Sequence, residues 1–157
     1  MDKEQIQEYT LRITRANKSE LVVVVYDLAI YYLEAALKAY DSKDYELFSA
    51  NARYANKCVG DLLGALDYDY ELSFSLMRIY AFVSKQISLA PIKKDRELLD
   101  SSRRMLEKLR KSFEEVAKAD DTAPLMSNTQ EVYAGFTYGK GSLNENIGGV
   151  SNRGFTV

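Results

Sequence analysis

The sequence predicts an all-α protein: an antiparallel up-and-down four-helix bundle with a short N-terminal helical segment and a C-terminal non-helical tail. Three observations predict this fold. Four long segments repeat apolar residues at helical spacing, short connections rich in capping residues separate them, and six of the eight glycines lie at Gly135 or later. Long helices joined by short connections pack as antiparallel neighbours. The predicted division is an N-terminal cap segment, 1–16, a bundle, 17–119, and a Gly-rich flexible tail, 120–157.

The N-terminal cap segment has its helical spacing in residues 3–14. Ile6, Tyr9 and Ile13 repeat there at steps of three and four. An isolated helix of this length is marginal in water. We therefore expect it to be helical where it packs against the bundle.

The first bundle helix is predicted over residues 21–40. Its four consecutive valines suggest a strand, but the run continues to residue 40 without Gly or Pro, and that length favours a helix. Asn17 or Ser19 is the expected N-cap, and Glu20 in the first turn suits the helix dipole.

One face of this helix carries a seam of polar residues. Its members recur at steps of three and four along one helical face: Glu20, Asp27, Glu34, Lys38 and Asp41. Val24 and Tyr31 lie on the same seam, where solvent-facing residues are expected. The helix therefore carries more apolar surface than one side of a bundle needs.

The other three bundle helices follow from the same periodicity. They are predicted over residues 45–63, from 72 to a stop at Pro91, and over 95–119. Proline disfavours a helical residue before it, which is why the third helix is expected to end there. The Asp-Tyr-Asp-Tyr stretch at 67–70 supplies candidate N-caps for that helix.

Composition excludes most catalytic and metal-binding classes. The chain has no histidine, which removes the usual general base and the His-containing metal sites. Asp67, Asp69 and Glu71 resemble the start of a calcium loop, but its required Gly and Glu are replaced by Leu72 and Arg78. We therefore expect no enzyme activity, no metal and no cofactor.

Charge and hydropathy predict a cytoplasmic protein. The start of the chain lacks a secretion signal, and the apolar runs are too short to span a bilayer, so no direct membrane insertion is expected. Cys58 is the single cysteine, predicted to be a buried inert thiol. Residues 1–119 hold 19 basic and 19 acidic side chains, and this balance argues against a nucleic-acid partner.

The surplus apolar surface points to binding. Ten of the twelve tyrosines lie in residues 1–119, and tyrosine is enriched at interfaces. Three interpretations stay open from periodicity alone: a groove for a client, self-association, or packing of Tyr31, Tyr32 and Tyr40 beneath the N-terminal segment and the tail.

Several motifs in the predicted helices resemble those of the flagellin-specific export chaperones, the FliS family. The family's Leu-x-x-x-Leu-Tyr-Asp-Gly-Ala is similar to Leu21-x-x-x-Val25-Tyr26-Asp27-x-Ala29. The second-helix entry and the third-helix motif are similar to Ser42-Lys43-Asp44-Tyr45 and to Leu66-Asp67-x-x-Tyr70-Glu71-Leu72-Ser73-x-x-Leu76-x-x-Ile79-Tyr80-x-Phe82. Phe113 stands where the family often has Trp, and Leu28 stands where it has Gly. The resemblance covers roughly residues 5–117.

The resemblance implies a cytoplasmic chaperone that binds the disordered C-terminal segment of flagellin, prevents its premature polymerisation and docks at a component of the flagellar export gate. A weak homodimer is also compatible with it. Tyr26 and Asp27 would be the signature pair that holds the first bundle helix in register. The protein-binding residues implied by motif and periodicity together are Ile6, Tyr9, Ile13, Val24, Tyr26, Asp27, Tyr31 and Tyr32.

Two other hypotheses remain. The chain could be a self-associating helical bundle with a structural or regulatory role and no flagellin client. Alternatively, the tail could occupy the client groove as an internal competitor.

Overall fold

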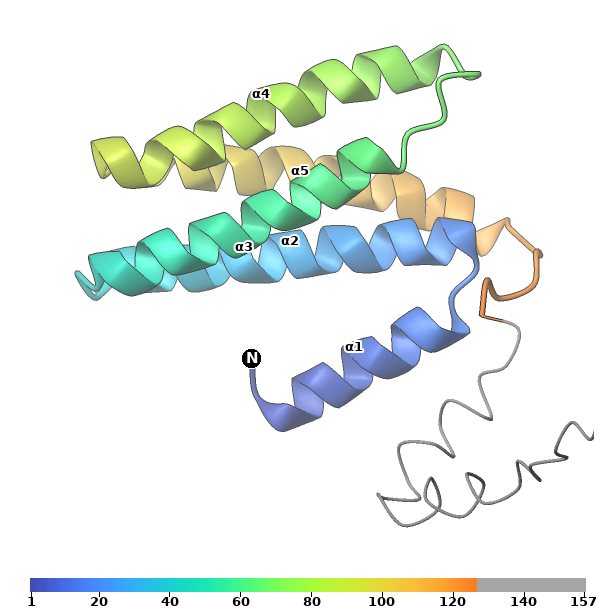
Figure 1. Cartoon of the computed structure of the whole chain (residues 1–157), viewed down its shortest axis with the longest axis horizontal. Coiled ribbons are helices and arrows are strands. Elements are labelled where there is room, and N and C mark those ends of the chain that lie inside the picture. Colours follow the sequence, from blue (N-terminus) through green and yellow to red (C-terminus); the bar gives the residue numbers. More distant parts are fainter. Residues whose placement is uncertain (127–157) are drawn as a thin grey trace, which may run out of the picture. The chain divides into compact units, whose positions relative to one another are not determined.

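The computed structural model describes residues 1–126, and the predicted flexibility of the tail beyond residue 126 lies outside this range. Five helices, and no strand, are found in residues 1–126 (Figure 1). Their bounds are α1, Lys3–Arg15; α2, Lys18–Asp41; α3, Tyr45–Gly64; α4, Leu72–Lys93; and α5, Arg96–Lys118. None of these helices is both long and apolar enough to cross a membrane.

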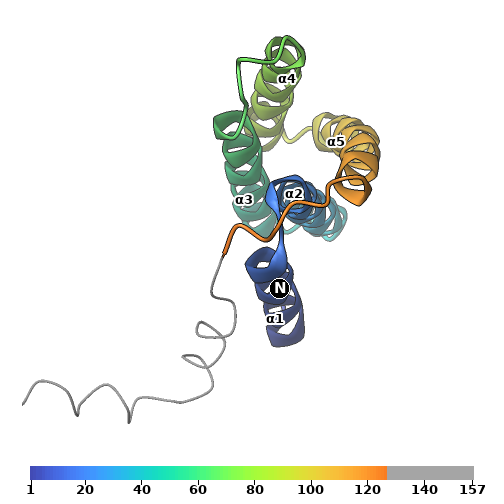
Figure 2. The same ribbon diagram turned by 90° about the vertical axis from the view of Figure 1, so that its right-hand side faces the viewer.

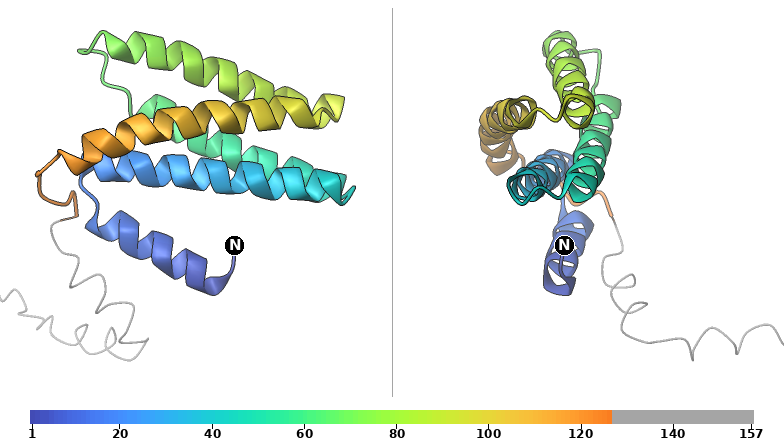
Figure 3. Two further views of the ribbon diagram at one scale, coloured as in Figure 1. Left: turned by 180° about the vertical axis from the view of Figure 1, so that it is seen from behind. Right: turned by 90° about the vertical axis from the view of Figure 1, so that its left-hand side faces the viewer.

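Helices α2 to α5 form the predicted antiparallel bundle. Helix α2 packs against α3 and α5, and α4 packs against the same two helices from the other side (Figure 2). Helix α1 lies outside this group, beside α2 and on the side of the bundle away from α4 (Figures 2 and 3). The predicted fold class is confirmed.

Capping residues set most of the helix starts. Asn17 caps α2 in a box with Glu20: the Asn17 side chain accepts from the Glu20 amide at 2.9 Å, and the Glu20 carboxylate accepts from the Asn17 amide at 3.0 Å. Asp44 and Asp95 cap α3 and α5 by accepting from backbone amides. These capping bonds satisfy amides that have no partner inside the helix.

Two predictions at the ends of α4 are wrong. Pro91 lies inside the helix, which continues to Lys93 and ends at Lys94 in the left-handed conformation, φ 50°. A proline so close to the helix end removes one internal hydrogen bond, and the small Ala90 before it stays helical and buried. At the other end, the N-cap is Glu71, outside the predicted stretch, and it makes no side-chain capping bond. Asp67 accepts from the amide of Asp69 within the preceding turn.

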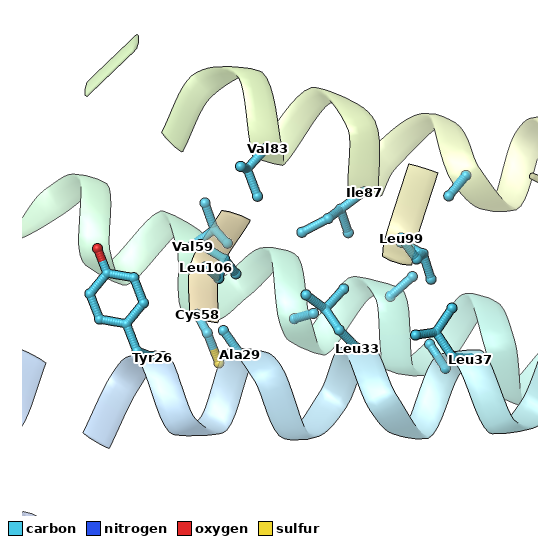
Figure 4. Close-up of a cluster of buried hydrophobic side chains, with 14 of the residues drawn as sticks. Tyr26, Ala29, Leu33, Leu37, Cys58, Val59, Val83, Ile87, Leu99 and Leu106 are labelled. Atoms are coloured by element: carbon cyan, nitrogen blue, oxygen red, sulfur yellow. The ribbon is translucent and has the colours of Figure 1, made fainter. Parts of the chain in front are cut away.

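The core is built from the apolar stripes of α2 to α5 (Figure 4). Its fully buried members include Leu33, Phe48, Val83, Leu99 and Leu106. Cys58 is also buried, and burial raises the pKa of its thiol to about 11. A thiol that is protonated at neutral pH is a poor nucleophile, in agreement with the predicted inert cysteine.

Candidate functional site

The polar seam of α2 is the surface on which α1 lies. Val24, predicted to break the seam toward solvent, is only 3% exposed, which corrects that expectation. Leu11 and Arg12 of α1 line a cavity of about 470 Å³ together with Val23 and Val24 of α2 and Ala117 of α5. The N-terminal helix therefore lies beside the apolar surplus of α2 and leaves a cavity between the three helices.

Helix α1 buries little of its own apolar surface against α2. None of its residues is buried, and Ile6 is 52% exposed. Tyr9 and Ile13 are half-buried. Burial raises the pKa of Tyr9, and the nearby Asp27 carboxylate adds to this effect. The helix is thus placed over α2 without being part of the core.

Polar contacts hold α1 in its place. Arg12 Nη2 lies 2.5 Å from Asp27 Oδ2, and the Tyr31 hydroxyl donates to Gln5 Oε1 at 3.3 Å. Gln5 also belongs to the capping box at the start of α1, where its amide donates to Asp2. The two contacts therefore lie about one helical turn apart on the seam of α2 and about two turns apart on α1.

Asp27 is the point where three helices meet. Its carboxylate pairs with Arg12 of α1 through one oxygen and with Arg110 of α5 through the other. Arg110 also reaches Glu114, 3.3 Å away. The Asp27 side chain is only 14% exposed, so these two arginines supply the countercharge that a largely buried carboxylate requires.

Tyr26, next to Asp27, points the opposite way. Its ring is fully buried, its hydroxyl is hydrogen-bonded to the Tyr80 hydroxyl of α4, and its centroid lies 5.4 Å from that of Phe113 in α5. Burial raises the pKa of Tyr26. The side chain is out of reach of a partner in this conformation, and it ties α2 to two other helices.

An aromatic cluster extends the seam toward α3. Tyr31 and Tyr32 meet edge to face with centroids 5.4 Å apart, and Tyr32 stacks on Tyr54 of α3 at 5.2 Å. Tyr31 and Tyr32 are half-buried, while Tyr54 is 55% exposed. We call Tyr31, Tyr32 and Tyr54 the tyrosine cluster. Exposed, mutually packed tyrosines are typical of interfaces.

Four residues that form these contacts were not predicted from the sequence: Gln5, Arg12, Tyr54 and Arg110. Arg12 and Arg110 lie in charged stretches where any of several residues could have faced Asp27. Tyr40, grouped with Tyr31 and Tyr32 in one prediction, is instead at the far end of α2, where its hydroxyl donates to the carbonyl of Lys94 at 3.1 Å.

The sequence model of one protein family, "Flagellar protein FliS", matches residues 2–120. This match covers α1 to α5 and the whole of the seam described above. The chain belongs to the FliS family. No individual curated protein matches the sequence.

Membership confirms the resemblance inferred from the helix motifs. FliS proteins are flagellar export chaperones, so this chain is assigned to flagellum assembly and protein export. The motif residue Tyr26 packs in the core, whereas its neighbour Asp27 anchors α1 and α5. The individual protein-binding roles given to these residues, and to the other six residues, stay predictions.

Proposed function

We propose that this FliS-family protein binds the C-terminal segment of flagellin as a helix along the seam of α2, in the place that α1 occupies. One observation carries the proposal. A surface that includes Val24 and Tyr31 is covered by a helix that buries none of its own residues. An amphipathic client helix can offer apolar side chains to such a groove where α1 offers mostly polar contacts.

The physical role of the chaperone follows from this exchange. A disordered segment that folds on binding loses conformational entropy, which keeps the complex reversible even when much apolar surface is buried. The client's own polymerisation surface is hidden while it is bound. In this proposal the complex forms in the cytoplasm and is then delivered to a component of the flagellar export gate, with no enzymatic step and no cofactor.

The experiment is a titration of a flagellin C-terminal peptide against the full-length protein and the variant Tyr31→Asp. A carboxylate in the tyrosine cluster opposes apolar contact with the client, and we expect the affinity to fall by a factor of about ten or more, roughly 1.4 kcal/mol. Circular dichroism establishes that the variant is folded.

The matched control is Tyr70→Asp. Tyr70 is 68% exposed on the connection between α3 and α4, on the opposite side of the bundle from α1 (Figures 1 and 3). This variant is expected to bind as the wild type does. Unchanged binding by folded Tyr31→Asp would remove the tyrosine cluster from the site.

Self-association without a flagellin client is the competing hypothesis. Analytical ultracentrifugation separates the two. A dimer that persists on dilution and ignores the peptide supports self-association, whereas a monomer or weak homodimer that forms a complex with the peptide supports the chaperone.

A further inference from the structure

The residues that follow α5 turn back across the junction between α1 and α2 (Figure 2). Four hydrogen bonds hold them there. Asn17 Nδ2 donates to the carbonyls of Asp120 and Thr122, at 3.1 and 3.3 Å, and the Ser19 hydroxyl donates to Asp120 Oδ2 at 2.5 Å. The amide of Leu125 donates to the carbonyl of Ala16 at 3.0 Å. We call residues 120–125 the clamp.

The clamp has a defined internal structure. Asp120 Oδ1 accepts from both the amide and the hydroxyl of Thr122, at 3.0 and 2.6 Å, which forms a turn of the kind that aspartate favours. The bonds from Ser19 and Thr122 lower the pKa of Asp120 to about 2. The carboxylate is therefore charged, and its hydrogen bonds are intact, throughout the physiological pH range.

Asn17 is suited to this position by its chemistry. Its Oδ1 caps α2 by accepting from the amide of Glu20, while its Nδ2 holds the clamp. Serine or aspartate caps a helix equally well but has no amide group to donate to two carbonyls. Asn17 and Ala16 are each 3% exposed, so the junction between the two helices is enclosed.

The clamp lies at the junction between α1 and α2, where its partners are Ala16, Asn17 and Ser19. Helix α1 buries no residue, and its polar contacts to α2 do not fix its axis if the junction at Ala16 and Asn17 can swing. We propose that residues 120–125 hold α1 over the seam of α2, and that α1 leaves the seam when the clamp is released. This inference rests on the proposed function, since it names the regulation of the same site.

The clamp is built to be reversible. It is held by polar contacts, while its last residue, Leu125, is 59% exposed and supplies no apolar anchor. Hydrogen bonds contribute little net free energy once ordering of the segment is included. The family model matches residues 2–120, so Asp120 is the one clamp residue within the matched range.

Two full-length variants test the clamp. Asn17→Asp keeps the cap of α2 and replaces the amide donor by a carboxylate that faces two carbonyls and Asp120. Asp120→Ala removes the carboxylate that Ser19 and Thr122 contact. The matched control is Asp121→Ala, because Asp121 is the exposed neighbour of Asp120.

Hydrogen exchange of the α1 amides is the first measurement. We expect exchange to become about three- to tenfold faster in Asn17→Asp and Asp120→Ala and to be unchanged in Asp121→Ala, because local opening sets the exchange rate. Unchanged exchange in both clamp variants would overturn the clamp.

Affinity for a flagellin C-terminal peptide is the second measurement. Releasing α1 raises the population of the open form, and the affinity should rise by a similar factor. Unchanged affinity with faster α1 exchange would overturn the control of client binding by the clamp. Absence of peptide binding in every variant and in the wild type would overturn the proposed function, while the exchange data would still decide whether the clamp holds α1.

Discussion

Helix α2 meets the rest of the molecule through two interfaces of opposite character. Toward α3, α4 and α5 it presents fully buried side chains such as Tyr26 and Leu33. Toward α1 it presents a seam whose named contacts are an ion pair and a tyrosine hydroxyl. The first interface builds the core, whereas no residue of α1 is buried in the second.

The energetic scales of the two interfaces explain this difference. Burial of one leucine-sized side chain stabilises a protein by about 1.5–3 kcal/mol. A partly exposed ion pair such as Arg12–Asp27, with Arg12 36% exposed, contributes about 0.2–1 kcal/mol. In the proposed function, a client that brings a few apolar side chains to the seam competes favourably with α1.

The largest expected effect comes from breaking the core side of α2. Leu33→Ala leaves a cavity among fully buried neighbours, and we expect the free energy of unfolding to fall by about 2–5 kcal/mol. Ile6→Ala, on the exposed side of α1, should change it by less than about 0.5 kcal/mol. Urea denaturation followed by circular dichroism measures both. Equal losses would show that α1 is part of the core.

A smaller effect is expected at the hydroxyl pair in the core. Tyr26→Phe leaves the Tyr80 hydroxyl buried without its partner, which should lower the stability by about 1–3 kcal/mol. Replacing both tyrosines by phenylalanine removes both polar groups and should restore much of the loss. A double-mutant cycle in urea measures the coupling, and additive losses would contradict a direct hydroxyl–hydroxyl bond.

The sequence was sufficient to predict the bundle helices because residue spacing and capping are properties of short, continuous segments. The length of the run without Gly or Pro identified α2 as a helix, and Asn17, one of the two expected N-caps, caps its start. One of the predictions that failed, a helix end at Pro91 in α4, came from treating one lost hydrogen bond as decisive near a helix terminus.

The seam was only partly predictable because it depends on contacts between distant segments. Periodicity identified Val24 and Tyr31 as unusual, and that signal correctly marked where another element lies. It could not show that Arg12, rather than another basic residue, would pair with Asp27. Nor could it show the clamp, because the partners of the Asn17 amide lie 103 and 105 residues away in the sequence.

The smallest expected change in stability comes from the seam itself, at Arg12→Gln. Asp27 keeps Arg110 as its partner, so no carboxylate is left without a countercharge, and the free energy of unfolding should fall by less than about 1 kcal/mol. Hydrogen exchange should nevertheless become faster in α1 while exchange in α2 to α5 stays as in the wild type. High salt should reproduce part of the effect in the wild type, because it screens a partly exposed pair.

Arg96→Gln is the matched control, since Arg96 is about as exposed as Arg12 and pairs with Asp41 between two bundle helices, without touching α1. If both variants changed α1 exchange equally, the Arg12–Asp27 pair would have no particular role in holding α1, and the seam would have to be held by its remaining contacts.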